Sequence, residues 1–174
     1  MTDRNKEKRI VIFGNGCSGK TTLSKNINLP RYHLDEIYWS LRSFKHSPTG
    51  YYRKKHNDIL KKDSWVIEGT PDLYFEKRQN RADLIIFLDT NRFVCIYRLI
   101  KRNIKNIIHK DTSSFCRPGW LNLKTLKWLL NYNKKQKKTI LNYALAHHAD
   151  KLIISKGNRY CTRISDLFLS TKIR

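Results

Sequence analysis

A run of eight residues near the amino end combines glycines, a lysine and a threonine at a spacing suited to binding phosphate. The run is Gly14-Asn15-Gly16-Cys17-Ser18-Gly19-Lys20-Thr21, which fits the P-loop pattern G-x-x-x-x-G-K-[ST]. Backbone N–H groups of such a loop converge on an anion, and glycine allows phosphate oxygens to approach closely. We expect Lys20 to contact the outer phosphates of ATP, Thr21 to bind Mg²⁺, and Thr22 to complete the nucleotide site.

The segments on either side of this run have the order that a P-loop requires. Ile10-Val11-Ile12-Phe13 has the β-branched bias of a buried strand, and Thr22 to Ile27 can continue as a helix. The alternative is a glycine-rich turn that joins a strand to a helix and binds nothing. The strand–loop–helix context favours nucleotide binding.

A first acidic candidate follows a short predicted strand, Tyr32-His33-Leu34. Ligands of open α/β sheets lie beyond the carboxyl ends of the strands, which places Asp35 where a phosphoryl acceptor would bind. If the acceptor is an alcohol, Asp35 can take its proton. Capping of the helix-like run that follows is an equally good interpretation of Asp35.

Two further acids end apolar strands and compete for the Mg²⁺ role. Trp65-Val66-Ile67 leads to Glu68, and Leu84-Ile85-Ile86-Phe87-Leu88 leads to Asp89. A carboxylate at the end of a buried strand holds Mg²⁺ or its waters in P-loop enzymes. Glu68 is the first choice, and for either acid the alternative is capping of the next turn.

The run from Arg92 to His109 has the period of an amphipathic helix. Its basic residues Arg98, Lys101, Arg102 and Lys105 are three or four positions apart and share a face. Arg98 and Arg102 follow a strand at the point where a lid would begin, and they are candidates to neutralise a phosphoryl group in transfer. A solvated basic face is the alternative.

The length and the order of the patterns indicate one P-loop domain over residues 1–174, with a substrate-holding insertion at about 38–63 and a lid region at about 98–138. Helices are expected at 51–62, at about 123–147 and at 163–169, and a last strand at 151–155. Loops are expected at 40–50 and 110–122.

The composition narrows the class of protein. No apolar run approaches the roughly 20 residues of a membrane span, so we expect no membrane partner. Four scattered cysteines without a C-x-x-C pair suit a reducing cytoplasm, and the six histidines have no metal-ligand spacing. The net charge of +22 has two explanations, binding to nucleic acid or a general bias toward Lys. Nucleic acid is therefore a possible partner that we do not favour.

The order of several blocks resembles the adenylate-kinase-related P-loop proteins that are labelled as related to the DNA topology modulation protein FlaR. The blocks are GNGCSGKT (14–21), HLDEIYW (33–39), SWVIEGT (64–70), ADLIIFLD (82–89), CIYRLIKR (95–102) and LKWLLNY (126–132). The resemblance implies a three-layer α/β sandwich of the nucleoside-monophosphate-kinase type, with a parallel five-stranded sheet of order 2-3-1-4-5. It also implies an ATP-dependent kinase whose acceptor is not defined.

The chain departs from that group at two places. Glu68-Gly69-Thr70-Pro71 stands where the group usually shows Asp-Gly-Asn-Tyr, and lysines at 134, 135, 137 and 138 stand where arginines are usual. Lysine lacks the forked donors that grip phosphate at two points.

Three functions remain open at this stage. The first is a phosphotransferase that moves the γ-phosphoryl group of Mg-ATP to a small molecule or nucleotide. The second is a nucleic-acid-associated NTPase, for which the net charge of +22 would be the footprint. The third is a nucleotide-binding protein without catalysis.

Overall fold

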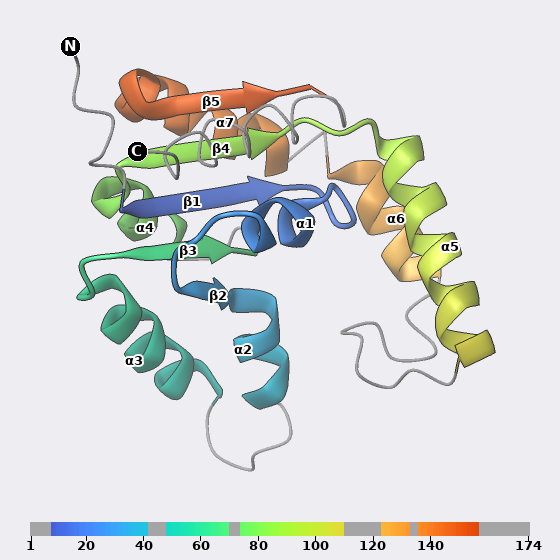
Figure 1. Cartoon of the computed structure of the whole chain (residues 1–174). Coiled ribbons are helices and arrows are strands. Elements are labelled where there is room, and N and C mark those ends of the chain that lie inside the picture. Colours follow the sequence, from blue (N-terminus) through green and yellow to red (C-terminus); the bar gives the residue numbers. More distant parts are fainter. Residues whose placement is uncertain (1–7, 42–47, 70–73, 110–122, 133–135, 157–174) are drawn as a thin grey trace, which may run out of the picture.

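Five parallel strands form the centre of the molecule, in the spatial order β2-β3-β1-β4-β5 (Figure 1). This computed structural model describes residues 8–41, 48–69, 74–109, 123–132 and 136–156. The strands are β1 (Arg9–Gly14), β2 (Arg31–His33), β3 (Trp65–Glu68), β4 (Leu84–Leu88) and β5 (Leu152–Ser155). The predicted strand order is confirmed.

Helices follow each of the first four strands and precede the last. They are α1 (Lys20–Lys25), α2 (Leu34–Leu41), α3 (Pro48–Leu60), α4 (Phe75–Arg81), α5 (Arg92–His109), α6 (Leu123–Asn131) and α7 (Gln136–His148), with a 3₁₀ turn at Ala149–Lys151. None of the helices in the described ranges is both long enough and apolar enough to cross a membrane.

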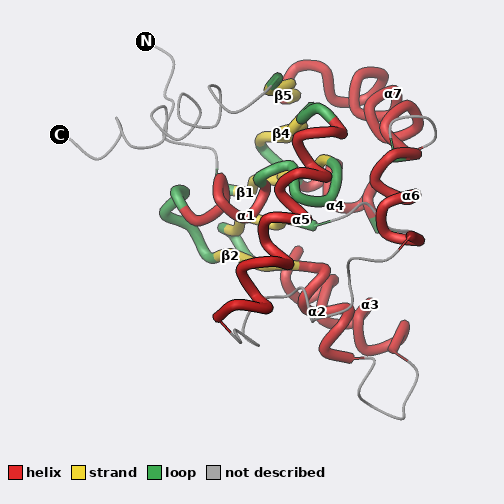
Figure 2. The backbone as a smooth tube through the Cα atoms, turned by 90° about the vertical axis from the view of Figure 1, so that its right-hand side faces the viewer, coloured by secondary structure: helices red, strands yellow, loops and turns green. Residues whose placement is uncertain are grey.

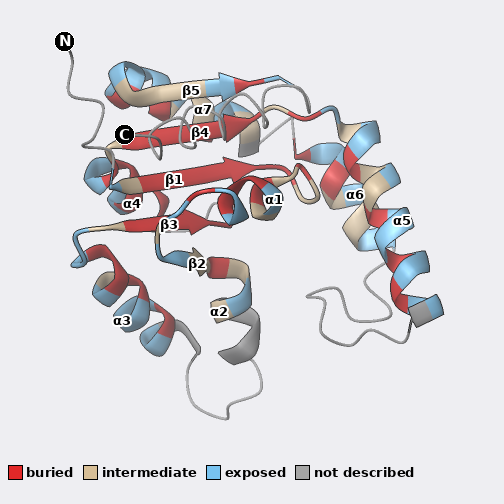
Figure 3. Ribbon diagram, in the orientation of Figure 1, coloured by how far each residue is buried: buried red, intermediate tan, exposed pale blue. Residues whose placement is uncertain are grey.

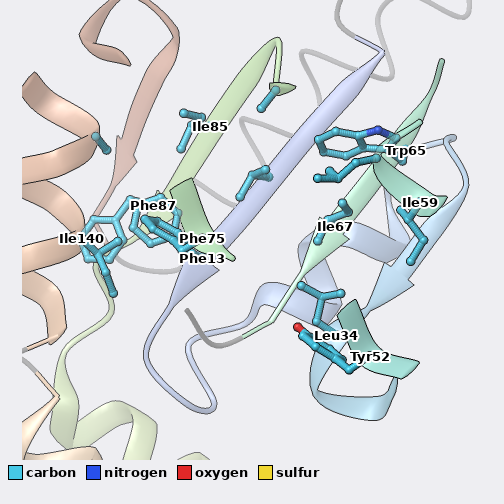
Figure 4. Close-up of a cluster of buried hydrophobic side chains, with 14 residues drawn as sticks. Phe13, Leu34, Tyr52, Ile59, Trp65, Ile67, Phe75, Ile85, Phe87 and Ile140 are labelled. Atoms are coloured by element: carbon cyan, nitrogen blue, oxygen red, sulfur yellow. The ribbon is translucent and has the colours of Figure 1, made fainter. Parts of the chain in front are cut away.

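The central strands are buried on both faces because helices cover both sides of the sheet (Figure 3). Val11 and Phe13 of β1 point to one face, where they pack with residues of α3, α4 and α7 (Figure 4). Ile10 and Ile12 point to the other face and pack with Leu23 of α1. The period-two alternation of β1 therefore supplies two cores, and the predicted three-layer sandwich is confirmed.

Four details differ from the sequence-based expectations. Both ends of the loop expected at 40–50 are helical, since α2 extends to Leu41 and α3 begins at Pro48. The second strand is Arg31–His33, so Asp35 lies in the first turn of α2. The single helix expected at 123–147 is two helices, because α6 packs on α5 while α7 packs on α4 and β5. The short helix α4 was not predicted, since its polar sequence FEKRQNR has no clear apolar period. The loop expected at 110–122 and the helix at 163–169 lie outside the described residues.

Parallel pairing brings the functional candidates to one edge. Ile12 of β1 is level with Glu68 of β3 and with Ile86 of β4, so the carboxyl ends of these strands coincide. The loop after β1, the end of β3 and the start of α2 meet at this edge. This is the edge at which open α/β sheets bind ligands.

Candidate active site

The loop between β1 and α1 is folded as a tight P-loop. Gly19 has a φ angle of 106°, in the left-handed region that side chains other than glycine rarely adopt. Inside the loop, Ser18 N–H donates to the Asn15 carbonyl at 3.2 Å. The Ser18 hydroxyl is buried and has no hydrogen-bond partner among the described residues. An orphaned buried donor in this loop fits a phosphate oxygen as its missing partner.

Lys20 lies at the first position of α1 and is buried. Its ammonium group donates to the carbonyls of Asn15 at 2.8 Å and Gly14 at 3.1 Å. Burial lowers the pKa of Lys20 from its ordinary value, and the negative charges of Asp35 and Glu68 oppose this effect. The charge therefore stands in a site of low dielectric, where its attraction for phosphate is strong.

Glu68 is fully buried at the end of β3 and accepts hydrogen bonds from two hydroxyls of α1. Thr21 Oγ1 donates to Oε2 at 2.9 Å, and Ser24 Oγ donates to Oε1 at the same distance. A threonine hydroxyl beside a carboxylate is a pair of hard oxygen donors, which suits Mg²⁺. Phosphate and water would have to supply the other ligands, because no group of three His, Cys, Asp or Glu in the described residues could hold a metal.

Asp89, the competing acid, has a different partner. Lys137 at the start of α7 donates to its Oδ1 at 2.7 Å, and both side chains are about one-quarter exposed. This ion pair ties α7 to the end of β4. Asp89 is thus paired with a lysine, whereas Glu68 accepts from the Thr21 hydroxyl.

Asp35 lies beside the end of β3. A Cβ atom built on Gly69 would be 3.0 Å from Leu34 Cβ and 3.5 Å from Asp35 Oδ1, so the first turn of α2 approaches the backbone directly after Glu68. Asp35 is half-buried and near enough to influence the pKa of Lys20. The structure therefore places Asp35 at the same edge as Lys20 and Glu68.

Two arginines of α5 reach the P-loop. Arg98 Nη1 donates to the carbonyls of Ser18 at 3.1 Å and Cys17 at 3.2 Å. Arg102 Nη2 lies 3.4 Å from the Cys17 sulfur. The other basic residues of the predicted row, Lys101 and Lys105, are exposed. The row is thus divided between a part that faces the loop and a part that faces solvent.

Helix α6, which packs on α5, also contacts the loop. A Cβ atom on Gly16 would be 2.8 Å from Leu129 Cδ2 and 2.9 Å from Trp128 Cζ3, so a larger residue at this position would have to displace these side chains. Asn15 Nδ2 donates to the Leu129 carbonyl at 3.1 Å, and Asn15 Oδ1 accepts from Gly16 N–H at 2.8 Å. The region predicted as a lid, 98–138, thus includes parts of two helices, α5 and α6, that contact the P-loop.

Several residues of the site were not predicted. They are Ser24, Thr90 (whose hydroxyl donates to the Ser18 carbonyl at 3.0 Å), Trp128 and Leu129, and Lys137 as the partner of Asp89. Ser24 could have been found, because it follows Thr21 by three residues and therefore shares its helix face. Thr22 is exposed on α1, and its role in nucleotide binding stays a prediction.

Solved structures that are similar to this chain in fold include small-molecule kinases. The chain is similar to the shikimate kinase from Acinetobacter baumannii in complex with shikimate, with 15% identity over 97% of this chain and 96% of that chain, and a TM-score of 0.61. It is also similar to the deoxyadenosine kinase from M. mycoides with bound dATP, with 15% identity over 94% and 99% of the two chains and a TM-score of 0.54. The chain has a P-loop kinase fold.

Other comparisons add little to this assignment. A gluconokinase from Sinorhizobium meliloti 1021 has a TM-score of 0.50 at 13% identity, over 97% of this chain and 99% of that one. No family model matches the chain, and no curated protein matches it in sequence. The resemblance to FlaR-related proteins therefore stays a prediction.

Proposed function

We propose that the protein is an ATP-dependent phosphotransferase that acts on a hydroxyl group of a small molecule. One observation carries the proposal: Lys20, Glu68 and Asp35 meet at the carboxyl edge of the sheet, beside a P-loop that Arg98 contacts. The fold is shared with kinases whose structures contain shikimate and dATP, and this likeness supports the same class of reaction.

The nucleotide end of the site is assigned to the P-loop. Backbone amides of residues 14–19 and the Ser18 hydroxyl bind the phosphates of ATP, and Lys20 turns from its carbonyl partners toward the β- and γ-phosphates. Mg²⁺, when bound, would neutralise phosphate charge. Thr21 would hold it directly, and Glu68 would hold it directly or through water.

Arginines of α5 are assigned to stabilise the negative charge that develops on the transferred phosphoryl group. Arg98 already reaches two loop carbonyls, so a small rotation of its side chain brings the guanidinium to a phosphate beside them. Arg102 is exposed and lies one helical turn farther along α5, where its positive charge adds to that of Arg98. Positioned cations of this kind stabilise phosphoryl transfer without covalent chemistry.

Asp35 is assigned to the acceptor. Its carboxylate lies beside Gly69 and close to the charge of Lys20, which suits a residue that orients an acceptor hydroxyl and takes its proton. A phosphorylated acceptor would need arginines around this position. In the described part of the insertion at 38–63, Arg53 is exposed on α3. An acceptor without a phosphate group fits this arrangement better.

The distribution of charge separates this proposal from a nucleic-acid-associated NTPase. Exposed basic residues of the described chain lie on six helices and in other segments: Lys25 on α1, Arg53, Lys54 and Lys55 on α3, Lys77 and Arg81 on α4, Lys101, Arg102 and Lys105 on α5, Lys124 and Lys127 on α6, Lys138 on α7, and Lys8, Arg31, Lys61, Lys62 and Lys156 elsewhere. Helices α3, α4 and α7 pack on one face of the sheet, whereas α1 packs on the other (Figure 2). A nucleic-acid-binding protein would be expected to gather its basic residues in one groove. The spread of basic residues over this chain argues against such a groove.

The test is a screen of ATP consumption against sugars, hydroxy acids, nucleosides and nucleotides, with Mg²⁺ present and Lys20→Ala as the control. The proposal predicts that at least one non-phosphorylated hydroxyl compound accelerates ADP formation by the natural chain and not by the variant. If polynucleotide alone accelerates hydrolysis, the nucleic-acid alternative is correct. If no compound raises turnover above the Lys20→Ala background, the phosphotransferase proposal is wrong.

A further inference from the structure

Helix α5 carries a row of exposed apolar side chains, which we call the α5 stripe. Its members Phe93, Tyr97, Ile100, Ile104 and Ile107 recur every three or four residues along the helix, and Ile108 adjoins the last of them. Their exposed fractions rise to 68% at Ile107 and 69% at Ile108. Single exposed apolar residues are ordinary, but a continuous row on one helix marks an interaction surface.

The α5 stripe lies on the opposite side of the helix from the residues that hold α5 to the protein. Cys95 and Leu99 are buried and pack against Leu129 of α6, and Asn103 and Asn106 continue the same buried side. With 3.6 residues per turn, Tyr97 and Ile104 project away from this side. Figure 2 looks onto the side of the molecule on which α5 lies, and α5 runs across the front of that view.

The positive charges beside the α5 stripe favour an anionic partner. The sequence of α5 has no acidic residue, and the exposed Lys101 and Lys105 adjoin the stripe along one flank. The whole chain carries a net charge of +22. If two copies packed with their α5 stripes in contact, these lysines would come close together. The positive net charges of the two molecules would also repel each other. Charge complementarity therefore argues against a second copy of the chain.

We propose that the α5 stripe docks on the surface of an anionic lipid bilayer. An interfacial helix buries an apolar face at the boundary of headgroups and acyl chains while Lys and Arg beside that face contact lipid phosphates. The stripe has this form, with two aromatic residues and four isoleucines over about 22 Å of helix. An acidic partner helix would be bound best if basic residues lined both flanks of the α5 stripe. Lys101 and Lys105 line one flank of the stripe.

Docking of this kind is compatible with the absence of a spanning helix among the described residues. The sequence-based expectation of no membrane partner rested on the lack of an apolar run long enough to cross the bilayer, and the proposal departs from that expectation. A helix that lies along the surface needs only one apolar face, because its other side stays packed on the protein or in water. The inference does not depend on the phosphoryl acceptor or on catalysis.

The experiment measures sedimentation of the full chain with two kinds of vesicle, one of phosphatidylcholine alone and one of phosphatidylglycerol with phosphatidylcholine. Because a strongly basic protein adsorbs to anionic lipid through charge alone, the decisive comparison is between variants of equal charge. Ile107→Glu/Ile108→Glu changes the stripe, and Leu123→Glu/Leu145→Glu changes exposed leucines on α6 and α7. The first pair is expected to lower binding to anionic vesicles at least tenfold, and the second pair to change it less than twofold.

Three outcomes would overturn the proposal. One is equal loss of binding in the two pairs of variants. Another is binding of the natural chain to neither vesicle while a designed acidic amphipathic peptide binds the stripe. The third is a dimer in analytical ultracentrifugation that the stripe variant abolishes, which would assign the surface to a second copy. If Ile107→Glu/Ile108→Glu lowers the thermal stability, Ile107→Asn/Ile108→Asn replaces it, and retained binding by that variant would equally contradict the proposal.

Discussion

The hydroxyl of Thr21 donates a hydrogen bond of 2.9 Å to Oε2 of Glu68, which joins the end of the P-loop directly to the end of β3. Both groups are assigned to Mg²⁺ in the proposed function. A cation that takes a lone pair of the Thr21 oxygen is placed within reach of the carboxylate that this hydroxyl already contacts. If the proposed function is correct, this contact holds the two residues together before the metal binds.

Glu68→Gln is expected to weaken the binding of Mg-ATP by about 10–100-fold, the usual effect of altering a residue that orients a bound metal. Binding of ATP without Mg²⁺ is expected to change little, because Lys20 and the loop amides are retained. Calorimetric titrations with Mg²⁺ and with a chelator measure the difference.

Asp89→Asn is the matched control, because its carboxylate is paired with Lys137. Its Mg²⁺ dependence should equal that of the natural chain, and its stability should fall by at most about 1 kcal/mol. If Asp89→Asn removed the effect of Mg²⁺ and Glu68→Gln retained it, the metal assignment would be reversed.

Ser24→Ala is expected to lower the free energy of unfolding by about 1–3 kcal/mol, because it leaves Glu68 Oε1 buried without the donor seen here. Ser155→Ala is the comparison, since the buried Ser155 hydroxyl has no hydrogen-bond partner in the described residues. Urea unfolding of the two variants tests this difference. Equal losses would show that the Ser24–Glu68 hydrogen bond adds nothing to stability.

Arg98→Ala is expected to lower kcat about 10²–10³-fold with the acceptor that the screen identifies, because it removes a cation from the transferred phosphoryl group. Arg98→Lys should recover part of this loss, since it keeps the charge without the forked donors. Lys101→Ala removes an exposed cation of the same helix and should leave kcat unchanged. A comparable loss in Lys101→Ala would indicate a general effect of charge on α5.

Lys20→Met is expected to raise the melting temperature of the ligand-free protein while it abolishes tight binding of Mg-ATP. Burial lowers the folded-state pKa of Lys20, so its charged form costs folding free energy below that pKa. Each kcal/mol recovered raises the melting temperature by roughly 2–4 °C at this chain length.

The same shift fixes the sign of the pH dependence. Between the lowered pKa and the ordinary value of 10.5, the unfolded chain binds more protons at Lys20 than the folded chain, so this residue's contribution to stability rises with pH. Lys20→Met lacks that contribution. Melting curves recorded across this alkaline range should therefore converge for the two proteins, and a constant difference would contradict the buried-charge explanation.

The parts of the site that were predictable from sequence are those that depend on local spacing. Residues 14–21, Glu68 at the end of its strand and the arginines on α5 follow from motif and period, and the strand order followed from the family resemblance. The packing of Trp128 against Gly16 and the ion pair of Lys137 with Asp89 join positions far apart in the chain. Such contacts depend on the positions that the helices take on the sheet. The spacing of apolar residues within one helix does not determine those positions.

The central claim is that the P-loop binds the phosphates of a nucleotide, and a calorimetric titration of Mg-ATP into the natural chain and into Lys20→Met tests it most directly. The account predicts one site per chain in the natural protein, displaced by inorganic triphosphate, and at least a hundredfold weaker binding in the variant. Equal affinity of the two proteins, or binding that triphosphate does not displace, would contradict it.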